Sequence, residues 1–376
     1  MSSRWSPLWL AGVLVLAAAA PVYLQAAHAP PNSDSVVHFL QLKSMWRGNI
    51  FLSGWRLPED NFYFTDLPFY LGIAAIAGPT SALVYMVPTV VYLAVLATAL
   101  LLIVSNVERP GEAWIAVPAG FFFLAMPAAA WPVLDSGCHT ACMLFGLAQI
   151  ALVAPILRGR TPTPRRLAAF ILLLTAMTAS DPFGLFAVAI PIGIFFVAGI
   201  LFDAGRRRIF LRLLAVTVGA AAAGSLIPNA IEFAGGFQTT WPIHVGPVPW
   251  QLLGANLLGV VRALAKLGGI RALGWNEPWR VEDGVRSIAA LAVIVSCVAA
   301  MTRVTRFTTR PSLMLILCAV FLLAASTVSR QFHNTLGSAE RYLVPVFVFA
   351  GVAAAMELPR LLGSMRSGSI RRAVLL

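Results

Sequence analysis

The first polar segment of the sequence places an aspartate and a histidine one helical turn apart. Asp34 and His38 are four residues apart, so in a helix their side chains share one face. A carboxylate there can act as a general base, and with His38 it can bind a divalent metal such as Mg or Mn. Asp34 is equally suited to cap a helix, and His38 to lie at a membrane interface without a ligand. The pattern predicts a helix over 34–46 and leaves these roles open.

A second aspartate precedes a group of potential metal ligands. Asp135 lies between two apolar runs and is followed by Cys138, His139 and Cys142. These residue types bind metals, but their spacing is not a zinc pattern. Asp135 can instead cap the next helix, and the cysteines can be small apolar fillers.

A third aspartate is isolated among apolar residues. Asp181 is the only charged residue in 167–202, and a charge inside an apolar stretch must face water, protein or a site. A single helix over 167–202 would be about 54 Å long, too long for the ~30 Å core of a bilayer. The turn signal before Pro182 therefore predicts a hairpin of two spans with Asp181 at its outer tip, where its alternative role is that of a turn residue.

Basic residues bracket the last polar segment. Arg330 and Arg341 can hold a phosphate bidentately, or anchor helix ends at the membrane surface. His333 lies between them. The earlier polar segment 228–287 is rich in tryptophan beside carboxylates, a combination found in membrane belts and in sugar-binding clefts.

The elements that must position these residues are membrane helices. Of the 376 residues, 59% are hydrophobic and only 11% charged, against about 25% charged in a typical soluble domain. So few charges suffice only if most of the surface faces lipid. We predict an all-α polytopic membrane protein with about ten spans, at 8–24, 82–104, 113–130, 141–157, two within 167–202, 213–227, 288–301, 313–328 and 342–356.

Four parts of this single transmembrane domain, 1–376, are distinguished by polarity. The first outer loop is 28–81, with interfacial helices at 34–46 and 68–77. The fourth outer loop is 228–287, with a basic amphipathic helix at 260–272. The tail 357–376 is basic.

The distribution of charge predicts the orientation. The formal net charge is +12, which in a soluble protein would suggest nucleic acid. Here the segments assigned to the inside hold 17 basic and 4 acidic residues, and those outside hold 10 and 11. The positive-inside rule then places both termini in the cytoplasm and the protein in the cytoplasmic membrane, with lipid and not nucleic acid as its partner.

The order of these features resembles the GT-C class of integral-membrane glycosyltransferases, which includes protein O-mannosyltransferases and aminoarabinose transferases. A signal-anchor span is followed by an outer aspartate, Asp34, at the start of a surface helix, and by Gly48 fourteen residues later. The stretch 61–70, which contains Asp66, resembles the aromatic and proline-containing stretch that follows in the family. Asp135, the hairpin at Asp181 and the run 341–345 are also similar. The sequence departs from the family's Asp-Glu or Asp-x-Asp pattern, since Ser35 follows Asp34.

The resemblance implies transfer of a sugar from a polyprenyl-phosphate donor to an envelope glycan or lipid acceptor. Asp34 would be the catalytic base, and Asp135 would assist it or hold a metal with Asp34 or His38. Substrate contacts would come from the remaining candidates, which are His38, Asp66, Asp181, Arg330, His333 and Arg341. No nucleotide-binding motif is present, in agreement with a lipid-linked donor.

Two other classes of function fit the sequence. A secondary transporter would use Asp181 as a proton or ion site, although such proteins commonly contain inverted repeats, and none is evident here. A non-catalytic membrane protein of envelope assembly is the third class. A single outer cavity shared by Asp34, Asp135 and Asp181 would favour the enzyme.

Overall fold

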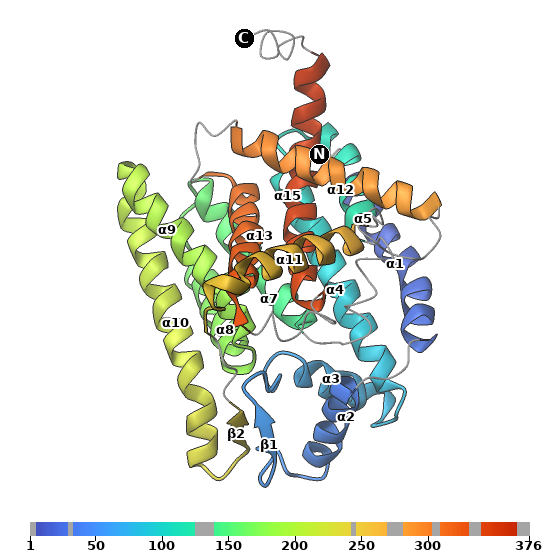
Figure 1. Cartoon of the computed structure of the whole chain (residues 1–376), viewed down its shortest axis with the longest axis vertical. Coiled ribbons are helices and arrows are strands. Elements are labelled where there is room, and N and C mark those ends of the chain that lie inside the picture. The colour runs from blue at the N-terminus through green and yellow to red at the C-terminus, as the bar shows by residue number, and fades with distance from the viewer. Residues whose placement is uncertain are drawn as a thin grey trace.

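The computed structural model describes residues 5–28, 33–124, 139–241, 246–268, 281–302, 309–330 and 340–366. These residues form thirteen α-helices and one two-stranded sheet, which confirms the all-α prediction (Figure 1). The helices are α1 (Trp5–His28), α2 (Ser33–Trp46), α3 (Leu67–Ala77), α4 (Leu83–Asn106), α5 (Ala113–Leu124), α7 (Thr140–Leu157), α8 (Pro164–Ser180), α9 (Ile190–Phe202), α10 (Arg207–Phe233), α11 (Leu253–Leu267), α12 (Val281–Thr302), α13 (Pro311–Val328) and α15 (Glu340–Arg366). The strands are β1 (Arg56–Pro58) and β2 (Gln238–Trp241).

Eight helices of the described residues are long and apolar enough to cross a membrane, so the chain is a multi-pass membrane protein. They are α1, α4, α7, α9 with the π-helical turn before it, α10, α12, α13 and α15. Ten spans were predicted. The other two correspond to α5, with 12 residues described, and α8, with 17. The described parts of both helices are too short to count among the helices that could cross a membrane.

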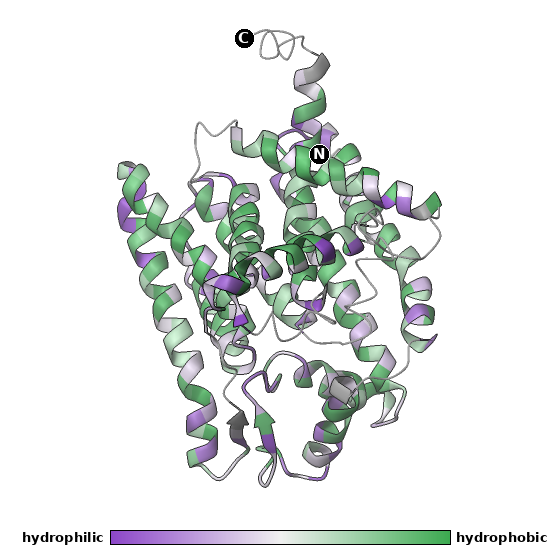
Figure 2. Cartoon of the chain, viewed as in Figure 1, coloured by the Kyte–Doolittle hydropathy of each residue, from purple (hydrophilic) through white to green (hydrophobic). Residues whose placement is uncertain are grey.

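The surface of the bundle is apolar, as contact with lipid requires. Figure 2 shows hydrophobic residues along most of the length of the long helices and hydrophilic ones mainly near their ends. Large side chains such as Trp9, Leu172 and Phe202 are among the most exposed. A water-soluble protein rarely exposes apolar surface on this scale. The exposed faces of these helices therefore contact the lipid bilayer.

Helix α15 occupies the centre of the bundle and contacts α4, α5, α7, α11, α12 and α13. Small residues allow this close packing, because a Cβ added to Gly120 of α5 would lie 2.4 Å from Ile103 and 3.3 Å from Ala355. Helices α11 and α12 cross α15 in Figure 1 instead of running beside it.

A glycine makes the contact between α8 and α10 possible. A Cβ added to Gly224 would lie 1.9 Å from Thr178 Oγ1 and 2.6 Å from the carbonyl oxygen of Thr175. We therefore expect Gly224→Ala to push the two helices apart and to lower the stability by about 1–3 kcal/mol. Gly219 is the matched control on the same helix, because an added Cβ there meets nothing within 4 Å. Thermal unfolding of both alanine variants in one detergent would contradict this packing if they melted alike.

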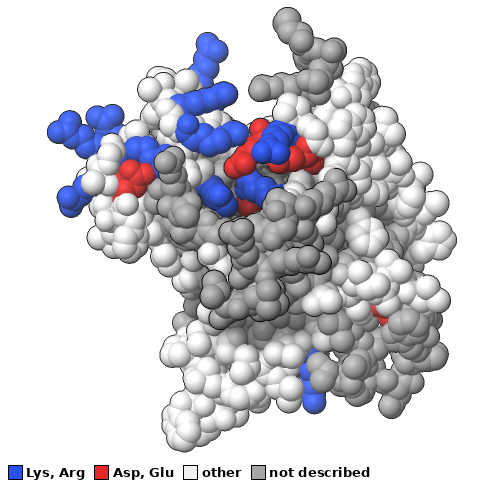
Figure 3. Space-filling view, turned by 90° about the horizontal axis from the view of Figure 1, so that it is seen from above, with Lys and Arg blue, Asp and Glu red and all other residues white. Residues whose placement is uncertain are grey.

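One end of the bundle carries most of its basic side chains, and we call it the arginine end. Figure 3 shows Lys and Arg gathered on this face around a smaller group of acidic residues. Arg360 pairs there with Glu357 at 2.5 Å and with Glu108 at 3.1 Å, and Arg206 pairs with Asp203 at 2.5 Å. Of these pairs, Arg360–Glu108 connects helix ends that are far apart in the sequence, whereas the other two join residues three positions apart.

The opposite end carries α2, α3 and the sheet, and is the lower end of Figure 1. Residues 47–66, between α2 and α3, form what we call loop 1. Strand β1 of loop 1 pairs in parallel with β2, and the Phe237 amide donates to the carbonyl oxygen of Phe51 at 2.8 Å. The sequence analysis did not predict this sheet, because three- and four-residue strands have no periodicity of their own. The sheet ties the first predicted outer loop to the fourth.

The surface helices follow the prediction in kind and differ in extent. Helix α2 matches the predicted 34–46 to within one residue, and α3 matches 68–77 equally well. Helix α11 is amphipathic, but it begins at Leu253 instead of residue 260. Asn256, in the first turn of α11, donates to the carbonyl oxygens of Thr327 and Ser329 and so attaches this turn to the end of α13.

Candidate functional site

Several predicted site residues lie outside the described part of the chain. Asp135 and His333 are among the residues that are not described. Asp34 lies in the first turn of α2, but its side chain is also outside the description. The proposed base and its partner acid therefore remain predictions. The other five candidates can be placed.

The centre of the candidate site is a buried ion pair between α7 and α8. His139 immediately precedes α7, and Asp181 ends α8. Their side chains meet at 2.6 Å between His139 Nδ1 and Asp181 Oδ2, and they are 4% and 0% exposed. Burial by itself lowers the pKa of His139, but the charge and hydrogen bond of Asp181 more than offset it, and the pKa is raised. At neutral pH this favours an imidazolium paired with a carboxylate.

Asp181 was predicted at the outer tip of a hairpin. The structure confirms that a turn separates α8 from α9 at this residue, but it places Asp181 inside the protein. Asp181 Oδ1 accepts a hydrogen bond from the Phe183 amide at 3.0 Å, so both carboxylate oxygens are occupied. Contact of Asp181 with a substrate would require this arrangement to open.

Asp66 is a second buried carboxyl beside this pair. It lies at the N-cap of α3, but its side chain makes no capping hydrogen bond. Asp66 Oδ2 is buried and has no hydrogen-bond partner among the described residues. Burial raises the pKa of Asp66 to about 7. The Thr65 side chain and the charge of His139 oppose this shift, and the charge of Asp181 adds to it. Asp66 is thus partly protonated at neutral pH.

Aromatic rings connect these groups to α2. The ring of Phe62, from loop 1, lies 5.0 Å from the His38 ring and 5.7 Å from the His139 ring. His38 is 3% exposed, and the centroid of its ring lies 5.8 Å from that of the Tyr70 ring. Helix α2 therefore turns His38 toward the protein, on the side opposite the exposed Val37 and Leu40. His38 thus contacts protein side chains, and its alternative role at the membrane interface without a ligand stays a prediction.

The first turn of α15 closes the other side of the site. The Tyr342 ring lies 5.7 Å from that of His139. Arg341 donates to the Tyr342 hydroxyl at 3.0 Å, and its charge acts on His139. Arg330 is not part of this group: it is exposed at the end of α13, and its amide donates to the carbonyl oxygen of Gly246. The two arginines proposed to bind phosphate thus occupy different environments.

Hydrogen bonds attach loop 1 to the end of α8, next to the His139–Asp181 ion pair. The Phe62 amide donates to the carbonyl oxygen of Ser180 at 3.1 Å, and the Phe64 amide donates to Ser180 Oγ at 2.5 Å. The Asn61 side chain donates to the carbonyl oxygen of Ala179 at 3.1 Å. These three bonds cover Asp181 with loop 1.

Two residues of the site have an unusual backbone. Phe62 has φ +53° and His139 has φ +61°, in the left-handed region that non-glycine residues seldom adopt, although His enters it more readily than Phe. Such conformations cost about 1–3 kcal/mol each and persist only where surrounding contacts hold them. Here the two strained residues touch one another, which marks the site as more than a packing junction.

The pairing of His139 with Asp181 was not predicted. His139 was considered only beside Cys138 and Cys142, as a potential metal ligand. The available signal was Asp181 itself, because an isolated acid in an apolar run needs a nearby partner. The few histidines of the chain were the natural candidates.

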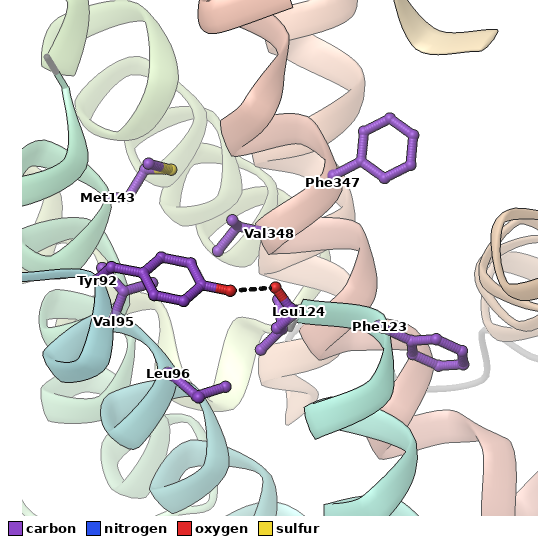
Figure 4. Close-up of a pocket in the computed structure, with 8 residues that line it drawn as sticks. All are labelled: Tyr92, Val95, Leu96, Phe123, Leu124, Met143, Phe347 and Val348. Carbon is purple, nitrogen blue, oxygen red and sulfur yellow. Dashed lines mark hydrogen bonds between the residues drawn. The ribbon is translucent and has the colours of Figure 1, made fainter. Parts of the chain in front are cut away.

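A separate apolar pocket lies deeper in the bundle (Figure 4). It is lined by Tyr92, Val95, Leu96, Phe123, Leu124, Met143, Phe347 and Val348. The Tyr92 hydroxyl donates to the carbonyl oxygen of Leu124 at 2.5 Å. No lining residue is charged, so this pocket offers no acid–base chemistry.

Within the described ranges, no group of three or more His, Cys, Asp and Glu side chains is arranged to hold a metal. Comparison of the chain with models of protein families, with curated proteins and with solved structures finds no match. The site therefore has to be interpreted from its own residues.

Proposed function

We propose that the protein transfers a sugar from a polyprenyl-phosphate donor to an envelope glycan or lipid acceptor, at the membrane face where loop 1 lies. One observation carries the proposal: polar side chains from loop 1, α7, α8 and α15 converge at the end where α2 begins. The order of α1, α2, α3 and α4 also agrees with the resemblance to the GT-C class. Such transfer needs carboxylates and cations near the lipid surface.

In this proposal Asp34 removes a proton from the acceptor hydroxyl, and Asp135 assists it. Arg330 and Arg341 hold the leaving phosphate. His38, Asp66 and His333 contact the substrate, which for the buried His38 and Asp66 requires loop 1 to move. Asp181 supports the site through its hydrogen bond with His139. The described residues offer no set of metal ligands, so no step is assigned to Mg or Mn.

A second candidate is proton-coupled transport, which the buried His139–Asp181 pair favours. Ionisable residues enclosed within a membrane protein commonly mark proton pathways. A transporter would move protons in sealed vesicles without consuming a lipid-linked sugar.

Proteoliposomes distinguish the two candidates. Purified protein is reconstituted into vesicles that contain a pH-sensitive dye. A radiolabelled polyprenyl-phosphate sugar is supplied as the donor and an envelope extract as the acceptor. We expect label to leave the donor lipid and enter the extract. Dye response without loss of donor would instead establish transport, and neither signal would contradict both candidates.

The arginine end faces the cytoplasm in this proposal, and loop 1 faces outward. Reporter fusions test this orientation. We expect a cytoplasmic signal from fusions after Arg109, Arg160, Arg208 and Arg306, and an outside signal near Asp60, Ser136 and Asn276. The reason is that positively charged segments are retained inside. A reversed pair would overturn the assignment.

A further inference from the structure

The group formed by Asp66, His139 and Asp181 contains one more carboxyl than its single imidazole can neutralise. With both carboxylates ionised and His139 protonated, the group carries a net negative charge in a place without solvent. Two carboxylates that share a buried site do not both ionise readily, because their repulsion is poorly screened there. One additional proton would make the group neutral.

The two carboxyls belong to different parts of the fold. Asp66 ends loop 1, whereas Asp181 ends α8. An aspartate at an N-cap ordinarily accepts a hydrogen bond from the first turn of its helix. Asp66 makes no such bond, and its carboxyl instead interacts with the side chains of Thr65, Asp181 and His139. Repulsion between the two carboxylates therefore acts across the boundary between loop 1 and α8.

We propose that the group formed by Asp66, His139 and Asp181 binds one proton in addition to the proton on His139, and that this additional proton holds loop 1 docked on the end of α8. When the proton leaves, the repulsion between Asp66 and Asp181 opposes the three hydrogen bonds that loop 1 makes to Ala179 and Ser180. The proton comes from and returns to water, and no covalent bond changes.

Other titratable and charged groups face the three residues from each neighbouring element. They are His38 of α2, Asp60 of loop 1, Tyr70 of α3, Cys142 of α7, and Arg341 and Tyr342 of α15. Asp60 and Arg341 act on His139 in opposite directions. His38 is separated from the group by the Phe62 ring. The electrostatic repulsion across the boundary between loop 1 and α8 thus comes mainly from Asp66 and Asp181.

The strained backbone of Phe62 makes the docked state sensitive to this balance. Phe62 keeps φ +53° while its amide bonds to Ser180 and its carbonyl oxygen accepts from the Asp66 amide at 3.0 Å. Loss of docking would release this strain. A modest repulsion can therefore shift the equilibrium between docked and undocked loop.

The sign of the pH dependence follows from linkage. Docking raises the pKa of Asp66 to about 7, whereas an exposed aspartate titrates near 4. The docked state thus binds more protons than the undocked state between about pH 4 and pH 7, and docking weakens as the pH rises through this window. Above about pH 7 both states have lost the proton, and no further change is expected.

Hydrogen exchange of the full-length protein in nanodiscs tests the proposal. Peptides that cover 59–67 are followed in the wild type and in Asp66→Asn, which mimics the protonated carboxyl. The two proteins are compared at the same pH, so that the intrinsic pH dependence of exchange cancels. We expect the ratio of wild-type to variant exchange to rise by up to tenfold per pH unit from about pH 5 to pH 7 and then to level off.

The control is Asp203→Asn, the same substitution in an ion pair at the arginine end. It should leave exchange of loop 1 unchanged. Infrared spectra of the wild type supply a second measurement that needs no variant: a protonated carboxyl band should be present near pH 5.5 and fade as the pH rises through about 7. An exchange ratio that is flat with pH, or the absence of this band, would overturn the proposal. Both readouts are independent of sugar transfer, so the inference stands or fails separately from the proposed function.

Discussion

Replacing Asp34 by Asn is expected to slow sugar transfer by about 10²- to 10⁴-fold, the usual contribution of a positioned general base. Asn has nearly the same shape as Asp and caps helices about as well, so α2 should form as before. Asn cannot accept the proton of the acceptor hydroxyl. The measurement is transfer of label from the polyprenyl-phosphate donor by equal amounts of folded protein.

Glu59→Gln is the matched control, because it removes one negative charge from the same predicted outer loop, 28–81, without touching the proposed catalytic residues. It should transfer sugar at nearly the wild-type rate. If Asp34→Asn also retained near-normal transfer, Asp34 would be only a residue of the first helical turn. Equal losses in both variants would point to the charge of the loop, and again not to a base.

The helices of this protein could be predicted from its sequence because their signals are local. An apolar run such as 82–104 is long enough to span a bilayer whatever surrounds it, and α4 indeed covers Leu83–Asn106. Helix α2 was predicted almost to the residue from Asp34 at its start and Gly48 beyond its end, where Gly48 adopts φ +96°. Both of these signals lie within a few residues of the helix that they delimit.

The contacts that build the site could not be predicted in the same way. Asp181 and His139 are 42 residues apart, and Asn61 reaches Ala179 across 118 residues. Such pairings depend on how helices pack, and hydrophobic periodicity carries no information on partners. The sequence did indicate that Asp181 needed an environment of its own, but its burial by loop 1 depends on bonds between two polar segments.

The buried His139–Asp181 ion pair is expected to contribute strongly to the stability of the fold. Asp181→Asn should lower the free energy of unfolding by about 3–5 kcal/mol, because it leaves His139 buried without its counter-charge. Asp203→Asn breaks a pair with Arg206 that is partly exposed, and about 0–1 kcal/mol is expected. Thermal unfolding in one detergent, followed by tryptophan fluorescence, compares the two variants with the wild type.

The loss of stability caused by Asp181→Asn should also depend on pH. The raised pKa of His139 means that the pair stabilises the fold fully below about pH 6.5, and that this contribution falls as the pH rises through the pKa of the folded protein. Removing Asp181 also removes a charge that raises the pKa of Asp66, which lessens the cost of ionising Asp66 at higher pH. Both effects make the gap between wild type and variant larger near pH 6 than near pH 9. A gap that was small or constant with pH would mean that His139 and Asp181 meet as neutral partners, and the charge-based account of this site would then be wrong.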